Sequence, residues 1–191
     1  MMSIKGTKTE QNLLKAFAGE SQARGRYTMF AKKARQEGYY QIADLFDETA
    51  RNEYEHSKQF FKYLEGGGVE ITAMYPAGMV GTTVDNLQAA ADGENEEHTT
   101  LYPGFADVAK EEGFKDVATT FLMVAKAEVA HEDRFLKLKA NILENKVFKR
   151  DQKVVWKCGV CGYLHEGYEP PQVCPSCKHE REHFELKGEN Y

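Results

Sequence analysis

At 191 residues, with 41% hydrophobic and 29% charged residues, the chain is long enough for one buried domain and a small appendage, and disorder is not indicated. Its formal net charge of −5 gives no support for a nucleic-acid-binding surface of clustered Lys and Arg. Residues 1–7 lack the apolar segment of a secretory signal, and no stretch approaches the roughly 18 apolar residues of a membrane span, so we expect a cytoplasmic protein.

The first helix is expected to begin near residue 8 and to end near Gly38. Thr7 with Glu10 three residues later has the form of a capping box, which indicates the helix start. Helical spacing puts one acid on the face that should be buried, which reads Leu13, Phe17, Glu20, Arg24, Tyr27, Ala31 and Ala34. Two partners for this acid stay possible, an ion pair with Arg24 one turn later and a bound metal ion.

The second helix is expected over residues 40–65, because three consecutive glycines follow it. A Glu-x-x-His pair interrupts its apolar stripe, which reads Ile42, Phe46, Thr49, Glu53, His56, Phe60 and Tyr63. The i to i+3 spacing puts the carboxylate and the imidazole on one face, where both can reach a common ion. Such a pair is usually a solvated face when exposed, but a buried carboxylate without a partner costs several kcal/mol, so we expect a metal ion as the partner.

A linker over residues 66–83 leads to the third helix. It can extend up to about 60 Å, whereas a 25-residue helix is only about 38 Å long. The linker can therefore cross the bundle and start the third helix parallel to the second, as in ferritin-like bundles. The third helix should cover residues 84–112 with a kink at Pro103-Gly104, and its buried face should read Leu87, Ala90, Glu94, Glu97, Leu101, Phe105 and Val108.

The fourth helix should follow Gly113 and reach about Asn145. It carries a second Glu-x-x-His pair on a stripe that reads Val117, Phe121, Val124, Glu128, His131, Phe135, Leu138 and Ile142. At an offset of 75, residues 27–62 match residues 102–137 at 13 of 36 positions, which indicates a duplicated helical hairpin.

Upstream of the repeated segment, the alignment of the two halves slips by one residue. Glu20 falls opposite Asn95, between two acids of the third helix. We take Glu94 as the counterpart of Glu20, which leaves Glu97 as an additional acid without a mate in the first half.

All four cysteines follow residue 157, in two Cys-x-x-Cys pairs separated by twelve residues: Cys158, Cys161, Cys174 and Cys177. This spacing favours a tetrahedral four-thiolate metal site over a disulfide framework and does not choose between zinc and iron. A charged linker over residues 146–153 precedes them, so we expect domains over residues 1–146 and 153–191. The second domain is too short for a real core, and its metal should supply much of its stability.

The buried acids and the two Glu-x-x-His pairs together form the constellation of carboxylate-bridged dinuclear sites in four-helix bundles. Mixed carboxylate and imidazole ligands favour iron or manganese, and therefore redox chemistry. With Glu97 included, five carboxylates carry a formal −5 against +4 for two ferrous ions and +6 for two ferric ions. One acid is thus surplus in the reduced state.

Along nearly its whole length the chain resembles rubrerythrin. The resemblance rests on the run Ala16-Phe17-Ala18-Gly19-Glu20-Ser21-Gln22-Ala23-Arg24, the two Glu-x-x-His pairs, Glu94 with Glu97, Tyr102-Pro103, Cys158-x-x-Cys161-Gly162-Tyr163 and Cys174-Pro175-x-Cys177. It implies a mainly α fold, a ferritin-like four-helix bundle with a small C-terminal rubredoxin-like domain. It also implies two irons held by Glu20, Glu53, Glu94, Glu97, Glu128 and His131, and one electron-passing iron held by Cys158, Cys161, Cys174 and Cys177.

The resemblance further implies two-electron reduction of hydrogen peroxide to water, in defence of an anaerobe's cytoplasm against oxidative stress. His56 would exchange with Glu97 as the oxidation state of the iron changes. Electrons would come from NADH through carriers, with a rubredoxin or its reductase as the donor to a homodimer. Tyr27 and Tyr102 lie beside the acids and are expected to hydrogen-bond ligand carboxylates, with plain core aromatics as the alternative.

Three features depart from the family pattern. The spacer between the cysteine pairs is shorter than in free-standing rubredoxins, and Lys178 stands where those proteins usually have Gly. His98 follows Glu97 where an aromatic residue is expected. Its position four residues after Glu94 makes it a candidate ligand, but we expect it to lie beside the site or at the surface.

Two other functions fit parts of the sequence. A ferritin-like ferroxidase or iron-handling protein would share the bundle, but it would have no use for an electron-transfer iron in the C-terminal domain. A structural bundle fused to a zinc ribbon for partner docking would leave the buried acids without a role. Peroxide reduction, which needs a route for electrons, accounts for both domains.

Overall fold

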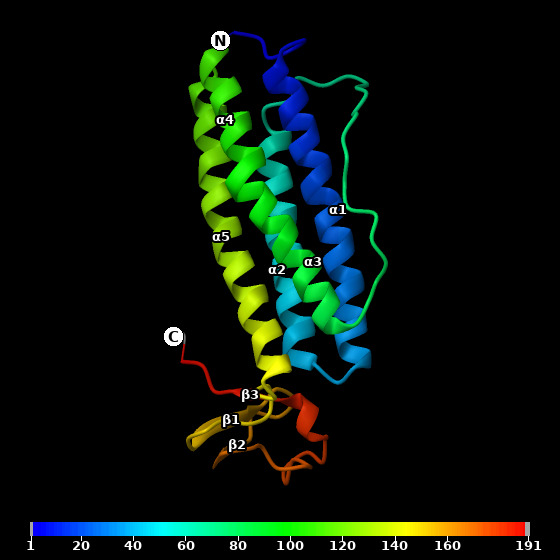
Figure 1. Ribbon diagram of the computed structural model, residues 1–191, viewed down its shortest axis with the longest axis vertical. Helices are drawn as coiled ribbons and strands as arrows, with labels where there is room; N and C mark the ends of the chain where they lie inside the picture. Colours follow the sequence, from blue (N-terminus) through cyan, green and yellow to red (C-terminus); the bar gives the residue numbers. More distant parts are fainter. Residues whose placement is uncertain (1, 190–191) are drawn as a thin grey trace.

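Long helices form a single bundle, and a small antiparallel sheet lies at one end of it in the computed structural model, which describes residues 2–189 (Figure 1). The helices are α1 (Lys8–Gln36), α2 (Tyr40–Phe61), α3 (Thr83–Glu96), the π-helical η1 (Glu97–Leu101), α4 (Tyr102–Glu111) and α5 (Lys115–Leu143). The mainly α, ferritin-like architecture is confirmed. None of the helices within residues 2–189 is long and apolar enough to cross a membrane.

The start of α1 is capped by Thr7, whose side chain accepts a hydrogen bond from the backbone N–H of Glu10. The Glu10 carboxylate binds the N–H of Gly6 at 2.7 Å, one residue before the position that a full capping box requires. The expected helix start is therefore correct, with a shifted second bond. The next helix, α2, ends at Phe61, four residues before the expected end at residue 65.

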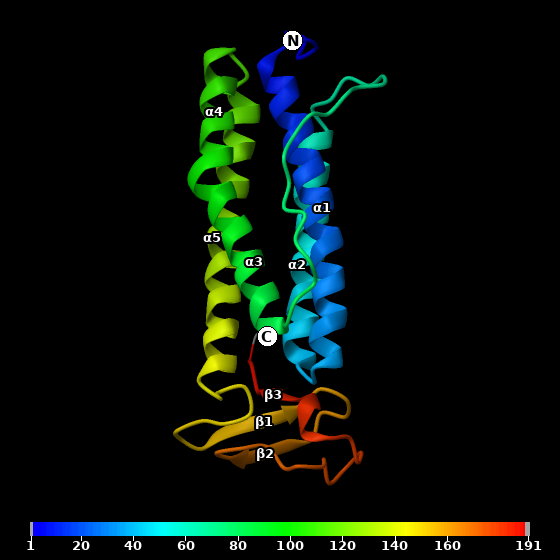
Figure 2. The same ribbon diagram turned by 45° about the vertical axis from the view of Figure 1, so that its right-hand side comes forward.

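The segment between α2 and α3 runs alongside α1 for most of the length of the bundle (Figures 1 and 2). It returns the chain to the end of the bundle where α2 begins, so α3 runs parallel to α2 as predicted. Thr82 and Asp85 form a full capping box at the start of α3. The long crossover is thus followed by a well-defined helix start.

The expected single kinked helix over residues 84–112 is wrong in one respect: the π-helical turn η1 divides it into α3 and α4. A π-helical turn inserts one extra residue, so the apolar face advances by one position beyond it. The buried residues are accordingly Tyr102, Ala106 and Ala109 rather than the predicted Leu101, Phe105 and Val108, which are half-buried. Pro103 is the second residue of α4 and lies in its first turn, where its missing N–H costs least.

The two helical hairpins of the sequence repeat have equivalent turns between their helices. Gly38 after α1 and Gly113 after α4 both have positive φ, 81° and 88°. Each allows the next residue to bond back across the helix end, Tyr39 N–H to Ala34 at 2.9 Å and Phe114 N–H to Ala109 at 2.7 Å. The two tight turns thus have the same geometry because each has a glycine at the equivalent position.

Two apolar clusters fill the bundle, one on each side of its middle. The first includes Phe30, Phe46, Leu87 and Phe135, and the second includes Leu13, Phe60, Phe121 and Val124. Four acids of the sequence stripes lie between these clusters and are buried: Glu20, Glu53, Glu94 and Glu128. Their side chains are therefore far from bulk water, which is what makes unpaired charge costly there.

The C-terminal domain contains β1 (Val154–Cys158), β2 (Leu164–Gly167), the short helix η2 (Arg181–His183) and β3 (Phe184–Leu186), with the strand order β2-β1-β3. Its small core consists of Trp156, Phe184 and two cysteines, Cys158 and Cys174. The His183 ring stacks on Tyr40 at the start of α2, with 4.1 Å between the ring centroids. The domain is therefore in contact with the end of its own bundle.

Candidate metal centres

Two groups of metal-binding side chains lie in the middle of the bundle. One consists of Glu20, Glu53, His56 and Glu128, and the other of Glu53, Glu94, Glu128 and His131. Within each group the ligand atoms all lie within 4.8 Å of one another. The two groups share Glu53 and Glu128, so these carboxylates are placed to bridge two ions while the others each face one.

The distances around the two histidines describe a coordination site better than a hydrogen-bond network. His56 Nδ1 lies 3.0 Å from Glu53 Oε2 and 2.8 Å from Glu128 Oε1. His131 Nδ1 lies 3.2 Å from Glu53 Oε1 and 2.7 Å from Glu128 Oε2. Each Nδ1 is thus close to two carboxylate oxygens at once, as donor atoms around a shared metal ion are.

Several buried atoms in this cluster have no hydrogen-bond partner among the described residues. They include Glu20 Oε2, Glu53 Oε1, Glu94 Oε2, both carboxylate oxygens of Glu128 and His131 Nδ1. Leaving a buried polar atom unpaired costs roughly 1–3 kcal/mol, and more for a charged group. Metal ions bound between these atoms would satisfy them together, and the donor set therefore fits a dinuclear centre.

Two tyrosines orient Glu94 and Glu20, the acids that each belong to one of the two ligand groups. Tyr27 Oη donates to Glu94 Oε1 at 2.5 Å, and Tyr102 Oη donates to Glu20 Oε1. Burial raises the pKa of both phenols well above the usual range, and the nearby carboxylates add to the rise. Both tyrosines therefore keep their protons and act as donors, as expected, rather than serving as apolar core residues alone.

The electrostatics of the acids also favour bound cations. Burial raises the pKa of Glu94 to about 8, although the imidazole of His131, 3.6 Å from Glu94 Oε2, opposes the rise. Burial likewise raises the pKa of Glu20 well above its usual range, and that of Glu97 rises for the same reason with the charge of Glu20 adding to it. These carboxylates repel one another, and cations among them would favour their charged forms.

Glu53 behaves differently because it lies between the two imidazoles. Burial disfavours its charge, but the neighbouring imidazoles of His131 and His56 outweigh burial and lower its pKa to about 2. Burial disfavours the charge on His131 as well, but the neighbouring carboxylates of Glu128 and Glu53 raise its pKa to about 12. The imidazoles thus place positive charge beside the carboxylates that the two ligand groups share, at the position where metal ions would supply it.

Glu97 and His98 lie at the edge of the site. Glu97 is half-buried in η1 and belongs to neither ligand group among residues 2–189. His98 Nε2 lies 2.6 Å from Glu132 Oε2, and Asn95 donates to the other oxygen of Glu132 at 3.0 Å. His98 is therefore placed beside the site, as expected. Glu132 was not among the predicted residues of this region, although its position next to His131 was a signal.

The ion pair between Glu20 and Arg24 is not formed. The Arg24 side chain is exposed and lies over the ring of Tyr54, with 4.5 Å between the guanidinium carbon and the ring centroid. Glu20 itself is fully buried and faces the metal cluster and Tyr102. Arg24 does not belong to the buried face of α1, because its position falls at the edge of the apolar stripe.

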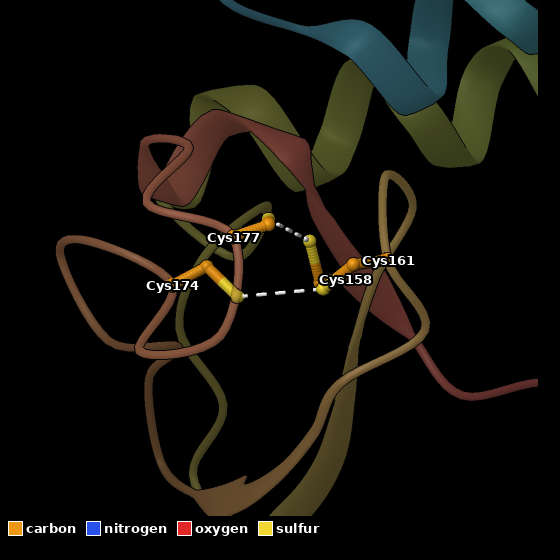
Figure 3. A group of neighbouring side chains, drawn as sticks. All are labelled: Cys158, Cys161, Cys174 and Cys177. Atoms are coloured by element: carbon orange, nitrogen blue, oxygen red, sulfur yellow. Dashed lines mark hydrogen bonds between the residues drawn. The ribbon is translucent and has the colours of Figure 1, made fainter.

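The four cysteines of the C-terminal domain point toward a common centre from two facing loops (Figure 3). The Sγ atoms of Cys158 and Cys177 are 3.7 Å apart, as are those of Cys161 and Cys174. A disulfide would require about 2.05 Å. Sulfurs at about 2.3 Å from one tetrahedral ion would be separated by a distance close to that observed.

Comparisons with known proteins agree with both centres. The rubrerythrin family model matches residues 11–139, and the model of the rubredoxin-like domain of rubrerythrin matches residues 156–185. The chain is 55% identical to a rubrerythrin of Clostridium perfringens over 195 aligned positions, covering all of both chains. It is 51% identical over all of both chains to a rubrerythrin of Nitratidesulfovibrio vulgaris.

A solved structure described as the fully reduced, all-ferrous state of nigerythrin is also similar. It superposes with a TM-score of 0.64 at 33% identity, covering 97% of this chain and 92% of the other. The carboxylate and imidazole cluster is a di-iron site, and the four cysteines form a rubredoxin-like iron site. With these two centres on one chain, the protein belongs to the rubrerythrin family, a family of oxidoreductases.

Proposed function

We propose that this protein is a peroxidase that reduces hydrogen peroxide to water. The O–O bond breaks, and one peroxide takes up two electrons and two protons to give two water molecules. The observation that carries the proposal is the pair of ligand groups that share Glu53 and Glu128, on a chain that also has a four-thiolate electron-transfer domain. An electron-transfer domain fits a reductase better than it fits an iron store.

When bound, the two irons would supply the two electrons that the peroxide accepts, and the four-cysteine iron would supply the electrons that replace them. Glu53 and Glu128 would bridge the ions. Glu20, Glu94 and His131 would each bind one of them, with Glu20 and Glu94 held in place by the tyrosine hydroxyls.

His56 and Glu97 would exchange as ligands when the oxidation state changes. The formal charge supports this, because five carboxylates exceed the charge of two ferrous ions but not that of two ferric ions. The geometry supports it too, since His56 belongs to a ligand group while Glu97 lies outside both groups. This arrangement corresponds to the one expected for the reduced centre.

We further propose that the protein acts in the cytoplasm as a homodimer, in defence against oxidative stress. NADH would be the source of electrons, and a rubredoxin or its reductase would deliver them to the C-terminal domain. These assignments rest on membership of the rubrerythrin family.

The test is peroxide-dependent oxidation of NADH by the iron-loaded protein in the presence of an NADH-dependent reductase and a rubredoxin, without oxygen. Glu53→Ala should abolish it, because it removes a bridging ligand. Glu55→Ala is the matched control, since Glu55 is an exposed acid on the same helix whose carboxylate pairs with Lys58 at the surface. Rapid oxidation of added ferrous iron with storage of ferric iron, without peroxide reduction, would instead identify the ferroxidase.

A further inference from the structure

A cavity of about 300 Å³ lies beneath the crossover segment, between α1 and the α3–η1–α4 rod. Residues 73–76 of the crossover form its roof. Tyr27, Glu97 and Tyr102 form the side of the cavity nearest the di-iron ligands, because the two tyrosines bind Glu94 and Glu20 directly. A molecule in this cavity would therefore approach the metal centre from the side of Glu97.

The cavity is much larger than hydrogen peroxide requires. One water molecule occupies roughly 30 Å³ in the liquid, and hydrogen peroxide has only one oxygen more. The remaining walls are mostly apolar and include Ala16, Ala23, Leu101 and Phe105. Four polar residues also line the cavity: Lys15, Gln22, Arg26 and Glu96. A cavity with a polar end and an apolar body fits an amphiphilic molecule with a small polar head.

Gly93 is a second sign that this space is kept open. It lies in α3, one turn before Glu97, and lines the cavity. A glycine inside a helix costs about 1 kcal/mol relative to alanine. Neither backbone conformation nor crowding accounts for it, because the residue is helical and an added Cβ would meet nothing within 4 Å. A larger side chain at this position would project into the open space.

The roof is attached to α1 by one aromatic residue of the crossover. Tyr75 donates its hydroxyl hydrogen to the carbonyl oxygen of Lys15 at 2.7 Å. Its ring lies against Gly19, with 3.5 Å between Cε1 and the place where a Cβ would be. Tyr75 thus holds the crossover segment against α1 at Gly19, the residue that precedes Glu20.

We propose that this cavity is a substrate chamber that admits small organic hydroperoxides as well as hydrogen peroxide, with Gly93 and Tyr75 setting its size. The inference rests on the peroxidase function proposed above. The hydroperoxide group would face Glu97 and the tyrosines, and the organic group would lie among the apolar walls. In the reaction the O–O bond breaks, and the hydroperoxide takes two electrons from the di-iron site and two protons, giving one alcohol and one water.

The experiment compares hydrogen peroxide, tert-butyl hydroperoxide and cumene hydroperoxide as substrates of the iron-loaded full-length protein. The wild type should reduce all three. Gly93→Leu should lower kcat/KM for cumene hydroperoxide about ten-fold more than for hydrogen peroxide, because its side chain fills the space for the organic group. Gly25→Leu is the matched control, since Gly25 is also a helical glycine with nothing within 4 Å of an added Cβ but lies outside the chamber.

A binding measurement separates the chamber from the chemistry. The non-reactive alcohol 2-phenyl-2-propanol is followed by saturation-transfer NMR with the same iron-loaded proteins. It should bind to the wild type and to Gly25→Leu, and the signal should be lost in Gly93→Leu. This result without reduction of any peroxide would support the chamber and overturn the peroxidase function.

Two outcomes would overturn the chamber. One is reduction of hydrogen peroxide by a wild type that neither reduces the organic hydroperoxides nor binds the alcohol. The other is equal loss of activity toward all three substrates in Gly93→Leu with its iron content unchanged. In either case the cavity does not select substrates by size.

Discussion

The phenol oxygen of Tyr27 lies 2.5 Å from Oε1 of Glu94, so a hydrogen bond joins α1 to α3 beside the metal cluster. Tyr102, the mate of Tyr27 in the repeated sequence, donates in the same way to Glu20. Each half of the chain thus orients a ligand of the other half. Tyr27 follows Glu20 by seven positions and Tyr102 follows Glu94 by eight, and the π-helical turn η1 accounts for the extra residue.

We expect Tyr27→Phe and Tyr102→Phe each to destabilise the protein by about 1–3 kcal/mol, because each leaves a buried carboxylate oxygen without its donor. Thermal unfolding of the iron-loaded protein measures this as a lower Tm. Tyr54→Phe is the control, since Tyr54 is exposed and its hydroxyl is not part of the cluster. A Tyr27→Phe variant as stable as Tyr54→Phe would show that the bond contributes nothing.

Glu97→Ala should spare the fold and lower peroxide turnover by about 10–100-fold, because it removes the carboxylate that the ferric pair needs. The residue is half-buried and outside both ligand groups, so its loss leaves the hydrophobic clusters intact. Steady-state kinetics together with circular dichroism provide the measurement. Glu111→Ala, at an exposed acid of α4, is the control. Turnover at the wild-type rate would mean that Glu97 does not exchange with His56.

The four-cysteine site should hold iron and make the purified protein red, since zinc cannot pass electrons to the bundle. Metal analysis and visible absorption of protein produced in iron-replete, zinc-poor medium are the measurements. Cys177→Ser should weaken or shift this absorption while the bundle keeps its two irons. A colourless wild-type preparation with zinc bound to the cysteines would reject the assignment.

Lys178→Gly should stabilise the C-terminal domain by about 1 kcal/mol. Lys178 has a φ of 67°, in the left-handed region that costs a residue with a Cβ roughly this much. The corresponding residue after the first cysteine pair is Gly162, with a φ of 77°. Lys178→Ala keeps the cost and should bring no gain. The measurement is the thermal loss of the iron–thiolate absorption, and equal midpoints for the two variants would contradict the prediction.

Electrons should cross from the four-cysteine iron of one chain to the di-iron site of its partner. The C-terminal domain contacts the end of its own bundle through His183 and Tyr40. Glu53 lies thirteen residues further along the same helix, about 20 Å away at 1.5 Å per residue. The domain is therefore well separated from the metal site of its own chain.

Complementation tests this prediction. A variant without the four-cysteine iron, Cys158→Ala with Cys161→Ala, is mixed with one without bridging ligands, Glu53→Ala with Glu128→Ala, and subunits are allowed to exchange. Mixed dimers should recover peroxidase activity that neither parent has. Mixed dimers that form, hold both kinds of iron and stay inactive would show that each chain reduces its own site.

The sequence alone determined where α1, α2 and α5 lie, the direction of the crossover and the acids that meet in the bundle. Its helical periodicity placed Glu20, Glu53, Glu94 and Glu128 on apolar stripes, and all four are buried. Periodicity is a local property, and so it survives from sequence to structure. The four cysteines were predicted to meet because two Cys-x-x-Cys pairs at this spacing are typical of a four-thiolate metal site.

Only the tertiary structure decided how the two halves fit together. The sequence shows that the alignment of its two halves slips by one residue, so that Glu20 falls opposite Asn95. The cause of the slip is the π-helical turn at Glu97, which packs against α5. The exposed position of Arg24 and the pairing of His98 with Glu132 are likewise set by neighbours distant in the chain. The chamber above Glu97 exists because Tyr75 holds a crossover without regular structure against α1, and no local pattern encodes a contact of that kind.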